Sequence, residues 1–354
     1  MGVGVEEVAG FLGDDPALVE WLGELERAGE PPDELVIPTA EEALTLLHRL
    51  RVPPRDAAEI AGGLPELQRD PVLVWLVRRC AHRTAADVGG FRPGGSWPDL
   101  PGDWGRYFYV YVFLTVLPSV RAYHEQRGIS DDISWATLAA LGGAVESHRQ
   151  RLGTGGMDAP FWIDLHFRGG IYLLGRLGFN RGELGFLAPA VRAAGLPYGE
   201  SDPALGVHAA PTGALDPAAC DASFNLAREF FGRHFPEEPY RIARCGSWIL
   251  DEQLTEYLPA DSNIIRFQRR FRLAAETRDG DADVLSRIFG AAPGTDLATL
   301  PRRTTLQRAL IDHLRAGRHW KIGFGWLELW RSPKPERQTR ARDLSAEPAR
   351  GRTC

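Results

Sequence analysis

The sequence predicts an α+β protein with a helical N-terminal domain, residues 1–157, and a second domain, residues 158–330, in which helices flank a mixed β-sheet. Two observations support this division. Up to about residue 152 the apolar side chains recur at helical spacing behind good capping residues. Past the glycine-rich segment LGTGGM (152–157), short runs of aromatic and branched residues alternate with amphipathic segments, which is typical of strands and helices within one domain.

Capping residues indicate where helices begin in the first domain. Asp15 and Asp70 each precede a proline, which is favoured at the first position of a helix. Thr39 is followed three residues later by Glu42, the spacing of a capping box. Ser130 stands in the same way ahead of the last long helical pattern. We therefore expect amphipathic helices that pack on one another.

One segment of this domain, Tyr107–Val120, is ambiguous because it is rich in β-forming residues. Its length and its continuation into an amphipathic pattern favour a buried helix, which Gly128 would end. It is shorter than the ~20 apolar residues that span a bilayer, so no membrane segment is expected.

The second domain reads as a succession of short elements. In order we expect a short helix or strand at 161–169, two strands joined by a turn at 171–184, a strand at 205–210, a helix at 217–231, a strand at 241–250, a short helix at 251–258, a strand at 263–273, a helix at 304–316 and a final strand pair at 319–330. From 205 to 273 the order is β-α-β-α-β. Past 331 the composition becomes polar, with proline and arginine, so a disordered tail is expected.

Composition excludes several classes of function. The net charge of −6 offers no basic surface for a nucleic-acid backbone. The cysteines have no CxxC spacing, so neither a zinc site nor a disulfide framework is expected; they are Cys80, Cys220, Cys245 and Cys354. The first residues lack the basic region of a secretory leader. We expect a cytoplasmic protein without metal, and the oligomeric state is open.

The first candidate site is the turn that leads from the 205–210 strand into the next helix. Free N–H groups and the positive end of the helix dipole favour a phosphate there. Its residues are Thr212, Gly213, Ala214, Leu215 and Asp216. The alternative is a plain helix cap, in which the Asp216 carboxylate takes those donors itself.

A second group lies at the ends of two strands. His208 could accept a proton from an amine, and Ser247 could donate a hydrogen bond. Cys245 would complete a Cys–His pair, although a small buried side chain is the preferred interpretation for it. For His208 the alternative is a hydrogen-bonded core histidine. Tyr257, after the second strand, is a candidate general acid or an amphipathic packing residue.

A third candidate is the pair His166 and Arg168 at the domain junction. No second histidine lies at helical spacing, so metal binding is not favoured. The remaining interpretations are a pair that orients a substrate and a purely structural contact.

Long blocks of the chain resemble a known family. The blocks are WIDLHFRGGIYLLGRLGFNR, GALDPAACDASFNLAREFFGRHFPE, CGSWILDEQLTEYLPADSNIIRFQRRF and LPRRTTLQRALIDHLRAG. They are similar to actinobacterial acyltransferase-domain proteins, which join a helical N-acyltransferase N-terminal domain to a C-terminal domain with a GNAT-like fold. The likeness extends from the first helices to about residue 329.

The resemblance implies an acyl-CoA co-substrate. In GNAT-like folds its pyrophosphate lies at the turn that opens the helix after the fourth strand, which corresponds to 212–216 here. Its pantetheine runs between two splayed strands, here near 207–209 and 245–248. A tyrosine on the following segment often protonates the departing thiolate, and Tyr257 matches that position.

Two departures from the family pattern keep an alternative open. The turn PTGALDP lacks the usual Q/RxxGxG/A phosphate-loop pattern, so an acyl-carrier protein is the alternative donor. Gly246 stands where relatives commonly carry histidine. The leading hypothesis is an N-acyltransferase that acylates an amine of a small-molecule acceptor. The other is a non-catalytic GNAT-like module that binds a ligand or a protein.

Overall fold

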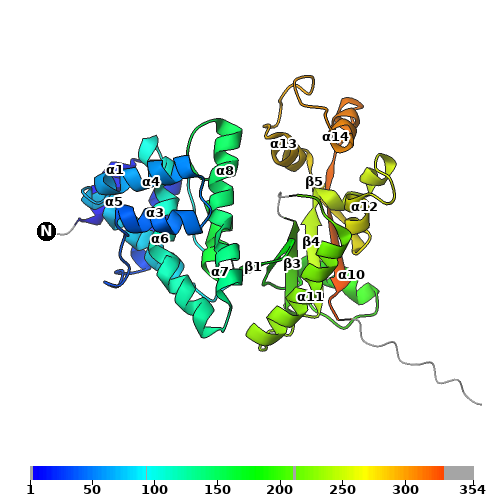
Figure 1. Cartoon of the computed structure of the whole chain (residues 1–354), viewed down its shortest axis with the longest axis horizontal. Coiled ribbons are helices and arrows are strands. Elements are labelled where there is room, and N and C mark those ends of the chain that lie inside the picture. The colour runs from blue at the N-terminus through cyan, green and yellow to red at the C-terminus, as the bar shows by residue number, and fades with distance from the viewer. Residues whose placement is uncertain (1–2, 93, 210–212, 331–354) are drawn as a thin grey trace, which may run out of the picture.

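The computed structural model describes residues 3–92, 94–209 and 213–330. A helical domain and a sheet domain lie side by side and meet where α7 approaches β1 (Figure 1). The tail expected past residue 331 lies outside the described residues, and so does Thr212.

The helical domain confirms the predicted caps. Side chains of Asp15, Thr39, Asp70 and Ser130 each accept a main-chain N–H at the start of a helix. The helices are α1 (Val5–Leu12), α2 (Pro16–Arg27), α3 (Ala40–Arg49), α4 (Pro54–Leu67), α5 (Pro71–Ala86), α6 (Gly102–Gln126), α7 (Asp131–Leu138), α8 (Ala140–Leu152) and α9 (Pro160–Phe167).

The ambiguous segment is helical, as predicted. It forms most of α6, whose residues from Tyr107 to Leu117 are all buried. Neighbouring helices surround it, which explains an apolar sequence without one polar face. The α9 residues Ile163 and Phe167 belong to the same core. The packing of the helical domain therefore continues through α9, up to the start of β1 at Ile171.

The sheet domain contains β1 (Ile171–Leu174), β2 (Leu177–Asn180), η1 (Gly185–Leu187), α10 (Ala188–Ala193), β3 (Ala204–Ala209), α11 (Pro217–His234), β4 (Ile242–Ser247), η2 (Trp248–Leu250), η3 (Glu252–Glu256), α12 (Asn263–Gln268), β5 (Arg272–Asp279), α13 (Asp281–Phe289), α14 (Thr305–Arg315) and β6 (Lys321–Glu328). The strand order is β1-β2-β3-β4-β6-β5. Neighbours are antiparallel except β3 and β4, which are parallel.

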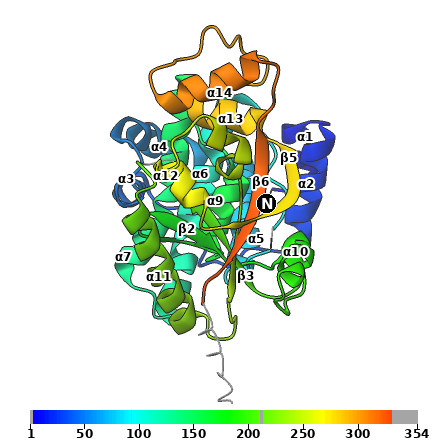
Figure 2. The same ribbon diagram turned by 90° about the vertical axis from the view of Figure 1, so that its right-hand side faces the viewer.

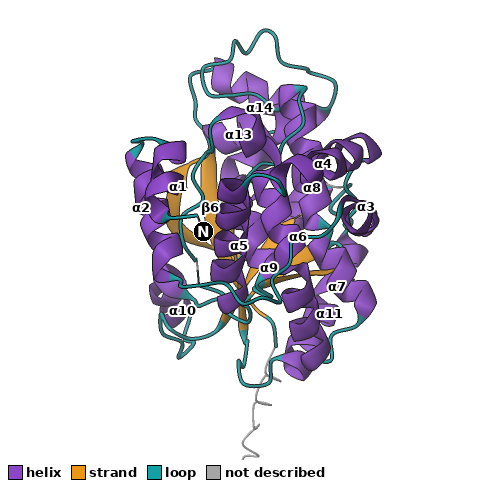
Figure 3. Cartoon of the chain, turned by 90° about the vertical axis from the view of Figure 1, so that its left-hand side faces the viewer, coloured by secondary structure: helices purple, strands orange, loops and turns teal. Residues whose placement is uncertain are grey.

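The two faces of the sheet are covered differently. Helices α11 and α12 pack on one face and share a core with β1–β4 (Figure 2). The helical domain lies over the other face (Figure 3), where η1 and α10 add a small second core. No helix in the described ranges combines the length and apolarity needed to cross a membrane.

The strand predicted at 263–273 is wrong. Residues Asn263–Gln268 form α12, and the Ser262 side chain caps it by accepting from Ile265 N–H. The strand follows later as β5, Arg272–Asp279, which is largely exposed and polar. An exposed edge strand lacks the alternation that identifies buried ones.

The final strand pair is also wrong, because 321–328 is a single strand, β6. Its glycines do not mark a turn. A Cβ on Gly323 would lie 2.4 Å from Leu250 O, and a Cβ on Gly325 would lie 2.9 Å from Phe271 Cβ. These glycines let neighbouring segments approach the strand closely.

Candidate active site

Strands β3 and β4 pair at their beginnings and then separate. Their register runs through Ala204↔Ile242, Leu205↔Ala243 and Gly206↔Arg244 and then stops. Each strand nevertheless continues for three more residues and keeps its outer neighbour, β2 or β6. The sheet therefore opens between 207–209 and 245–247.

Main-chain groups face this opening, because successive residues of a strand point to alternate neighbours. On β3, Ala204 N–H donates to Gly182 O on the β2 side, so the N–H of Ala209 is directed toward β4. On β4, Arg241 O accepts from Leu329 N–H on the β6 side. By the same alternation, the main-chain N–H of Gly246 is directed toward β3. Neither residue has a partner across the gap in the register of the two strands. An extended ligand with amide groups can supply those partners.

The turn ahead of α11 is built as a capped helix start. Gly213 has a φ of 78°, a left-handed conformation that favours glycine. The Asp216 carboxylate accepts from Ala219 N–H at 2.9 Å, as the cap interpretation predicted. Leu215 is buried in the core and anchors the turn, while Ala214 contributes its carbonyl to the contact described next.

A cation stands at this turn that sequence reasoning missed. Arg176, in the β1–β2 turn, donates from Nε to Ala214 O and from Nη2 to Gly213 O, both at 2.8 Å. Its Nη1 is buried and has no partner among the described residues. Arg176 therefore adds a positive charge beside the N-terminus of α11. The sequence gives no sign of this contact, because Arg176 and the carbonyls that it binds are more than 35 residues apart.

His208, Cys245 and Ser247 do not come together. Side chains alternate between the faces of a sheet. Cys245 belongs to the core under α11 with Val207, so His208 points to the opposite face, toward the helical domain. Ser247 lies on the α11 side and its hydroxyl accepts from Ile249 N–H at 3.4 Å. Burial raises the pKa of Cys245 to about 12, which argues against a thiolate nucleophile.

One hydrogen bond fixes the tautomer of His208. Its Nε2 lies 2.7 Å from Asn180 Oδ1. The Asn180 amide is oriented by its Nδ2, which donates to Arg181 O at 2.9 Å. Oδ1 is thus an acceptor, Nε2 carries the proton, and Nδ1 of His208 holds the lone pair.

Gly206 makes this contact sterically feasible. It is the partner of Asn180 in the β2–β3 register. A Cβ at Gly206 would lie 1.8 Å from Asn180 Oδ1, so any side chain there would displace the amide from His208. No sequence motif identifies Asn180 and Gly206, because they come close to His208 only when β2 and β3 pair.

Helix α9 supplies the other side of this group. Trp162 and His166 are four residues apart and share a helix face. The Trp162 ring contacts both imidazoles, with centroids 4.7 Å from His208 and 5.7 Å from His166. His166 Nδ1 donates to Trp162 O at 3.0 Å, which leaves its Nε2 as an acceptor. The structure therefore brings the predicted residues His166 and His208 together around one tryptophan.

Both histidines are uncharged at neutral pH. Burial lowers the pKa of His208 to about 3, with a smaller contribution from nearby His166 and Arg244. Burial likewise lowers the pKa of His166 to about 4. A neutral imidazole keeps one nitrogen lone pair that can accept a proton or a hydrogen bond.

Arg168 takes no part in this group. It is buried, donates from Nε to Asp164 Oδ2 at 2.7 Å, and donates from Nη1 to Arg92 O at 2.7 Å. These bonds hold the loop around residue 92 against the domain junction. These bonds favour the second interpretation of Arg168, a structural contact at the domain junction, over a role in orienting a substrate.

Tyr257 also lies in a separate cluster. Its hydroxyl is 3.0 Å from His313 Nδ1 and receives Arg318 Nη1–H at 3.3 Å. The His313 ring stacks on Trp320 with centroids 3.9 Å apart. Tyr257 follows β4 on the α11 side of the sheet and contacts the core there.

A histidine at position 246 would require the Phe324 ring to move. A Cβ at this position would lie 2.6 Å from the Phe324 ring, which covers the glycine from β6. His208 is thus the imidazole that lies on this face of the sheet, where position 246 has none.

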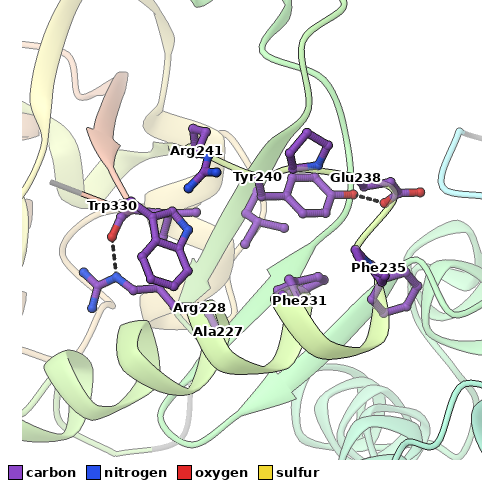
Figure 4. A pocket seen from close by; sticks show the side chains of 13 residues that line it. Ala227, Arg228, Phe231, Phe235, Glu238, Tyr240, Arg241 and Trp330 are labelled. Carbon is purple, nitrogen blue, oxygen red and sulfur yellow. Dashed lines mark hydrogen bonds between the residues drawn. The ribbon is translucent and has the colours of Figure 1, made fainter. Parts of the chain in front are cut away.

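Two cavities lie away from the opening in the sheet. One, of about 190 Å³, is formed by the C-terminal half of α11, Tyr240 and Trp330 (Figure 4). The other, of about 410 Å³, lies in the helical domain beside Glu24 and Arg83. Neither includes His208. Within the described ranges no group of three or more His, Cys, Asp or Glu side chains could hold a metal ion.

Comparisons with known proteins agree with this architecture. Residues 41–169 match the N-acyltransferase N-terminal domain family, and residues 171–327 match the GNAT-like C-terminal domain family. No curated protein matches the sequence.

Solved structures of acyltransferases are similar over nearly the whole chain. An acyltransferase in complex with decanoyl-CoA is 39% identical, with a TM-score of 0.83 over 93% of this chain and 100% of the other. One in complex with decanoyl-CoA and teicoplanin is 42% identical, and one with CoA and 10C-teicoplanin is 41% identical. Both have the same TM-score and the same coverage of each chain.

Proposed function

The chain belongs to the acyltransferase family that joins an N-acyltransferase N-terminal domain to a GNAT-like C-terminal domain, and from this premise we propose that it transfers an acyl group from acyl-CoA to an amine. The observation that carries the proposal is the opening between β3 and β4, with His208 on its edge. A relative binds decanoyl-CoA and teicoplanin together. We therefore take a fatty acyl-CoA as donor and a glycopeptide amine as acceptor.

The donor occupies the opening as an additional strand would. Its pantetheine amides bond to the main-chain groups that face the gap, and the Ser247 hydroxyl is a further donor at its end. The phosphates lie at the start of α11, where the N–H groups of Gly213 and Ala214 and the Arg176 cation favour negative charge. Asp216 serves as the cap of that helix. The thioester then lies within the opening itself, with His208 on one face of the sheet and Tyr257 on the other.

The reaction is an aminolysis of the thioester. The amine nitrogen attacks the carbonyl carbon, and the N–H groups of Ala209 and Gly246 stabilise the oxyanion. His208 Nδ1 accepts the proton that the amine loses, and His166 Nε2 orients the amine. As the tetrahedral intermediate collapses, the C–S bond breaks and the thiolate takes a proton from Tyr257, the only tyrosine after β4 in the sequence.

The direct test is acyl transfer with defined substrates. The protein is incubated with decanoyl-CoA and teicoplanin, and the glycopeptide is examined by mass spectrometry for the addition of one decanoyl group. Decanoyl carrier protein is the parallel donor. Transfer from the carrier protein alone would replace CoA as the donor. Transfer from neither, with no acyl-CoA binding by calorimetry, would leave the non-catalytic module as the better description.

Replacing Arg176 with glutamine should weaken acyl-CoA binding about tenfold, the loss expected for one partly screened charge-assisted contact. Calorimetry at two salt concentrations measures it, and the difference should shrink at high salt because screening reduces the contribution of the cation. The matched control is Arg233→Gln, an exposed arginine farther along α11. Equal affinities of wild type and the Arg176 variant would contradict the phosphate assignment.

Replacing Tyr257 with phenylalanine should lower kcat at least tenfold and leave the Kd for acyl-CoA unchanged. The stability should fall by about 1 kcal/mol, because the hydroxyl bonds to His313 and Arg318 are lost. His313→Gln separates the two effects, since it removes the same bond but keeps the phenol. A Tyr257 variant with lower stability and unchanged kcat would assign the residue a structural role only.

A further inference from the structure

Arg244 lies at the point where the sheet opens. It occupies the last paired position of β4, opposite Gly206. Ile242, two residues earlier, packs in the small core on the helical-domain side, whereas Cys245 packs under α11. By strand alternation Arg244 therefore shares its face with His208.

The guanidinium of Arg244 has no partner in the described part of the chain. No hydrogen bond or ion pair engages it, and its Nε is buried without an acceptor. Burial lowers the pKa of this side chain. Arg272, on the same face, differs: its guanidinium covers the Trp326 ring and lies 3.9 Å from Glu328. Among the described residues, Arg244 is thus a cation on this face that is both partly buried and uncompensated.

An uncompensated, partly buried charge is costly to the folded protein. A well-packed apolar residue of similar length would be less costly at this position. Sites that bind ligands are where such groups are retained, because the ligand supplies the missing charge. The geometry therefore indicates an anionic group that binds at Arg244.

The position of Arg244 places that anion beside the proposed base. A Cβ on Gly182 would lie 3.2 Å from Arg244 Nη2 and 3.5 Å from Asn180 Nδ2, so both side chains border the same small space. Asn180 in turn bonds His208 Nε2. The phosphates of acyl-CoA would lie at the start of α11, on the other face of the sheet. The anion near Arg244 thus comes from the acceptor.

We propose that Arg244 binds a carboxylate of the acceptor and thereby positions its amine against His208. This proposal rests on the proposed function and narrows the acceptor to amines that also carry a carboxylate, such as peptide-derived compounds. A guanidinium donates two parallel N–H bonds to a carboxylate, which fixes its orientation.

The test compares teicoplanin with its carboxyl methyl ester, by calorimetry on the full chain. The wild type should bind the free acid about 10- to 100-fold more tightly than the ester, the range for a hydrogen-bonded charge. Arg244→Met should lose that preference and bind the ester as the wild type does. Arg244→Lys should restore part of it. Arg272→Met is the matched control and should keep the preference.

Two further measurements decide the interpretation. The Tm of Arg244→Met should equal or exceed that of the wild type, because an unpaired charge is removed. Its Kd for decanoyl-CoA should be unchanged. The proposal is overturned if the wild type binds acid and ester alike, if it binds neither, or if Arg244→Met weakens decanoyl-CoA instead. Absence of decanoyl transfer, with the acid preference intact, would contradict the proposed function and leave the carboxylate assignment standing.

Discussion

Replacing His208 with glutamine will lower kcat/KM for acyl transfer by about 10²- to 10⁴-fold, the range for loss of a positioned general base. The side chain stays similar in size and still reaches Asn180, so the fold is retained. What disappears is the Nδ1 lone pair, to which the proposed mechanism assigns the proton of the attacking amine. The Kd for acyl-CoA should stay within about twofold, because the proposed donor contacts involve the main chain and Arg176 and not His208.

Steady-state kinetics with decanoyl-CoA and teicoplanin measure this effect. His48→Gln is the control, because His48 is exposed on α3 far from the sheet. Asn180→Ala should lower kcat/KM by about tenfold, an intermediate loss. The variant removes the bond that fixes the tautomer of His208 but keeps the imidazole. Unchanged kcat/KM in the His208 variant would exclude its role as base and would favour a water-mediated route.

The pH profile provides an independent check on the same residue. Burial lowers the pKa of His208 to about 3, so the imidazole is already neutral at pH 5. The acidic limb of kcat/KM should then follow the pKa of the amine and move when an amine of different basicity is used. A limb fixed near pH 6.5 for every amine would contradict the assignment.

Acidification from pH 6.5 toward pH 4 should destabilise the protein steeply. Burial lowers the pKa of His124 and His166 to about 4 and that of His208 to about 3. Unfolded histidines titrate near 6.5. Between these values the unfolded chain binds more protons than the folded one, so stability is fully present above pH 6.5 and is lost as the pH falls.

One carboxyl group opposes this trend. Burial raises the pKa of Asp164 to about 6 even though Arg168 favours its charged form. The folded state therefore binds one proton there that the unfolded state does not, from about pH 6 down to about pH 4. Together these three histidines and Asp164 give a net uptake of about two protons on unfolding near pH 5, which corresponds to about 3 kcal/mol per pH unit.

Urea unfolding at pH 7.5, 6.0, 5.5 and 5.0 measures the slope. His124→Phe should lower the slope by the contribution of about one proton taken up on unfolding, because this buried histidine is neutral in the folded state. Its Nδ1 bonds to Ser134, and its Nε2 has no partner among the described residues. A stability that is flat from pH 7.5 to 5.0 would contradict the burial of these three imidazoles in the neutral form.

The errors in the predicted fold share one physical origin. Ser262 caps α12 by a local bond, but the apolar residues Ile264, Ile265 and Phe267 fit a strand as well as a short helix. The single strand β6 was divided because Gly323 and Gly325 are typical of turns when read locally. In both places packing against other segments selected the structure.

What the sequence determined by itself is what short-range interactions encode. Caps such as Asp15, Thr39 and Asp216 bond to N–H groups two or three residues away, so they mark helix starts in any tertiary context. The helical first domain, the β1–β2 hairpin and α11 were therefore predictable. The sequence also singled out His208 and His166 as candidates, and the structure places both against Trp162.

The tertiary structure alone decided which residues surround the candidate site. β3 and β4 are separated along the chain by the whole of α11, and their opening exists only because each keeps its outer neighbour after their own pairing ends. Strand alternation then moved Cys245 away from His208 and placed Arg244 beside it. Contacts between residues so distant in sequence are fixed by the packing of the complete sheet, which no local pattern records.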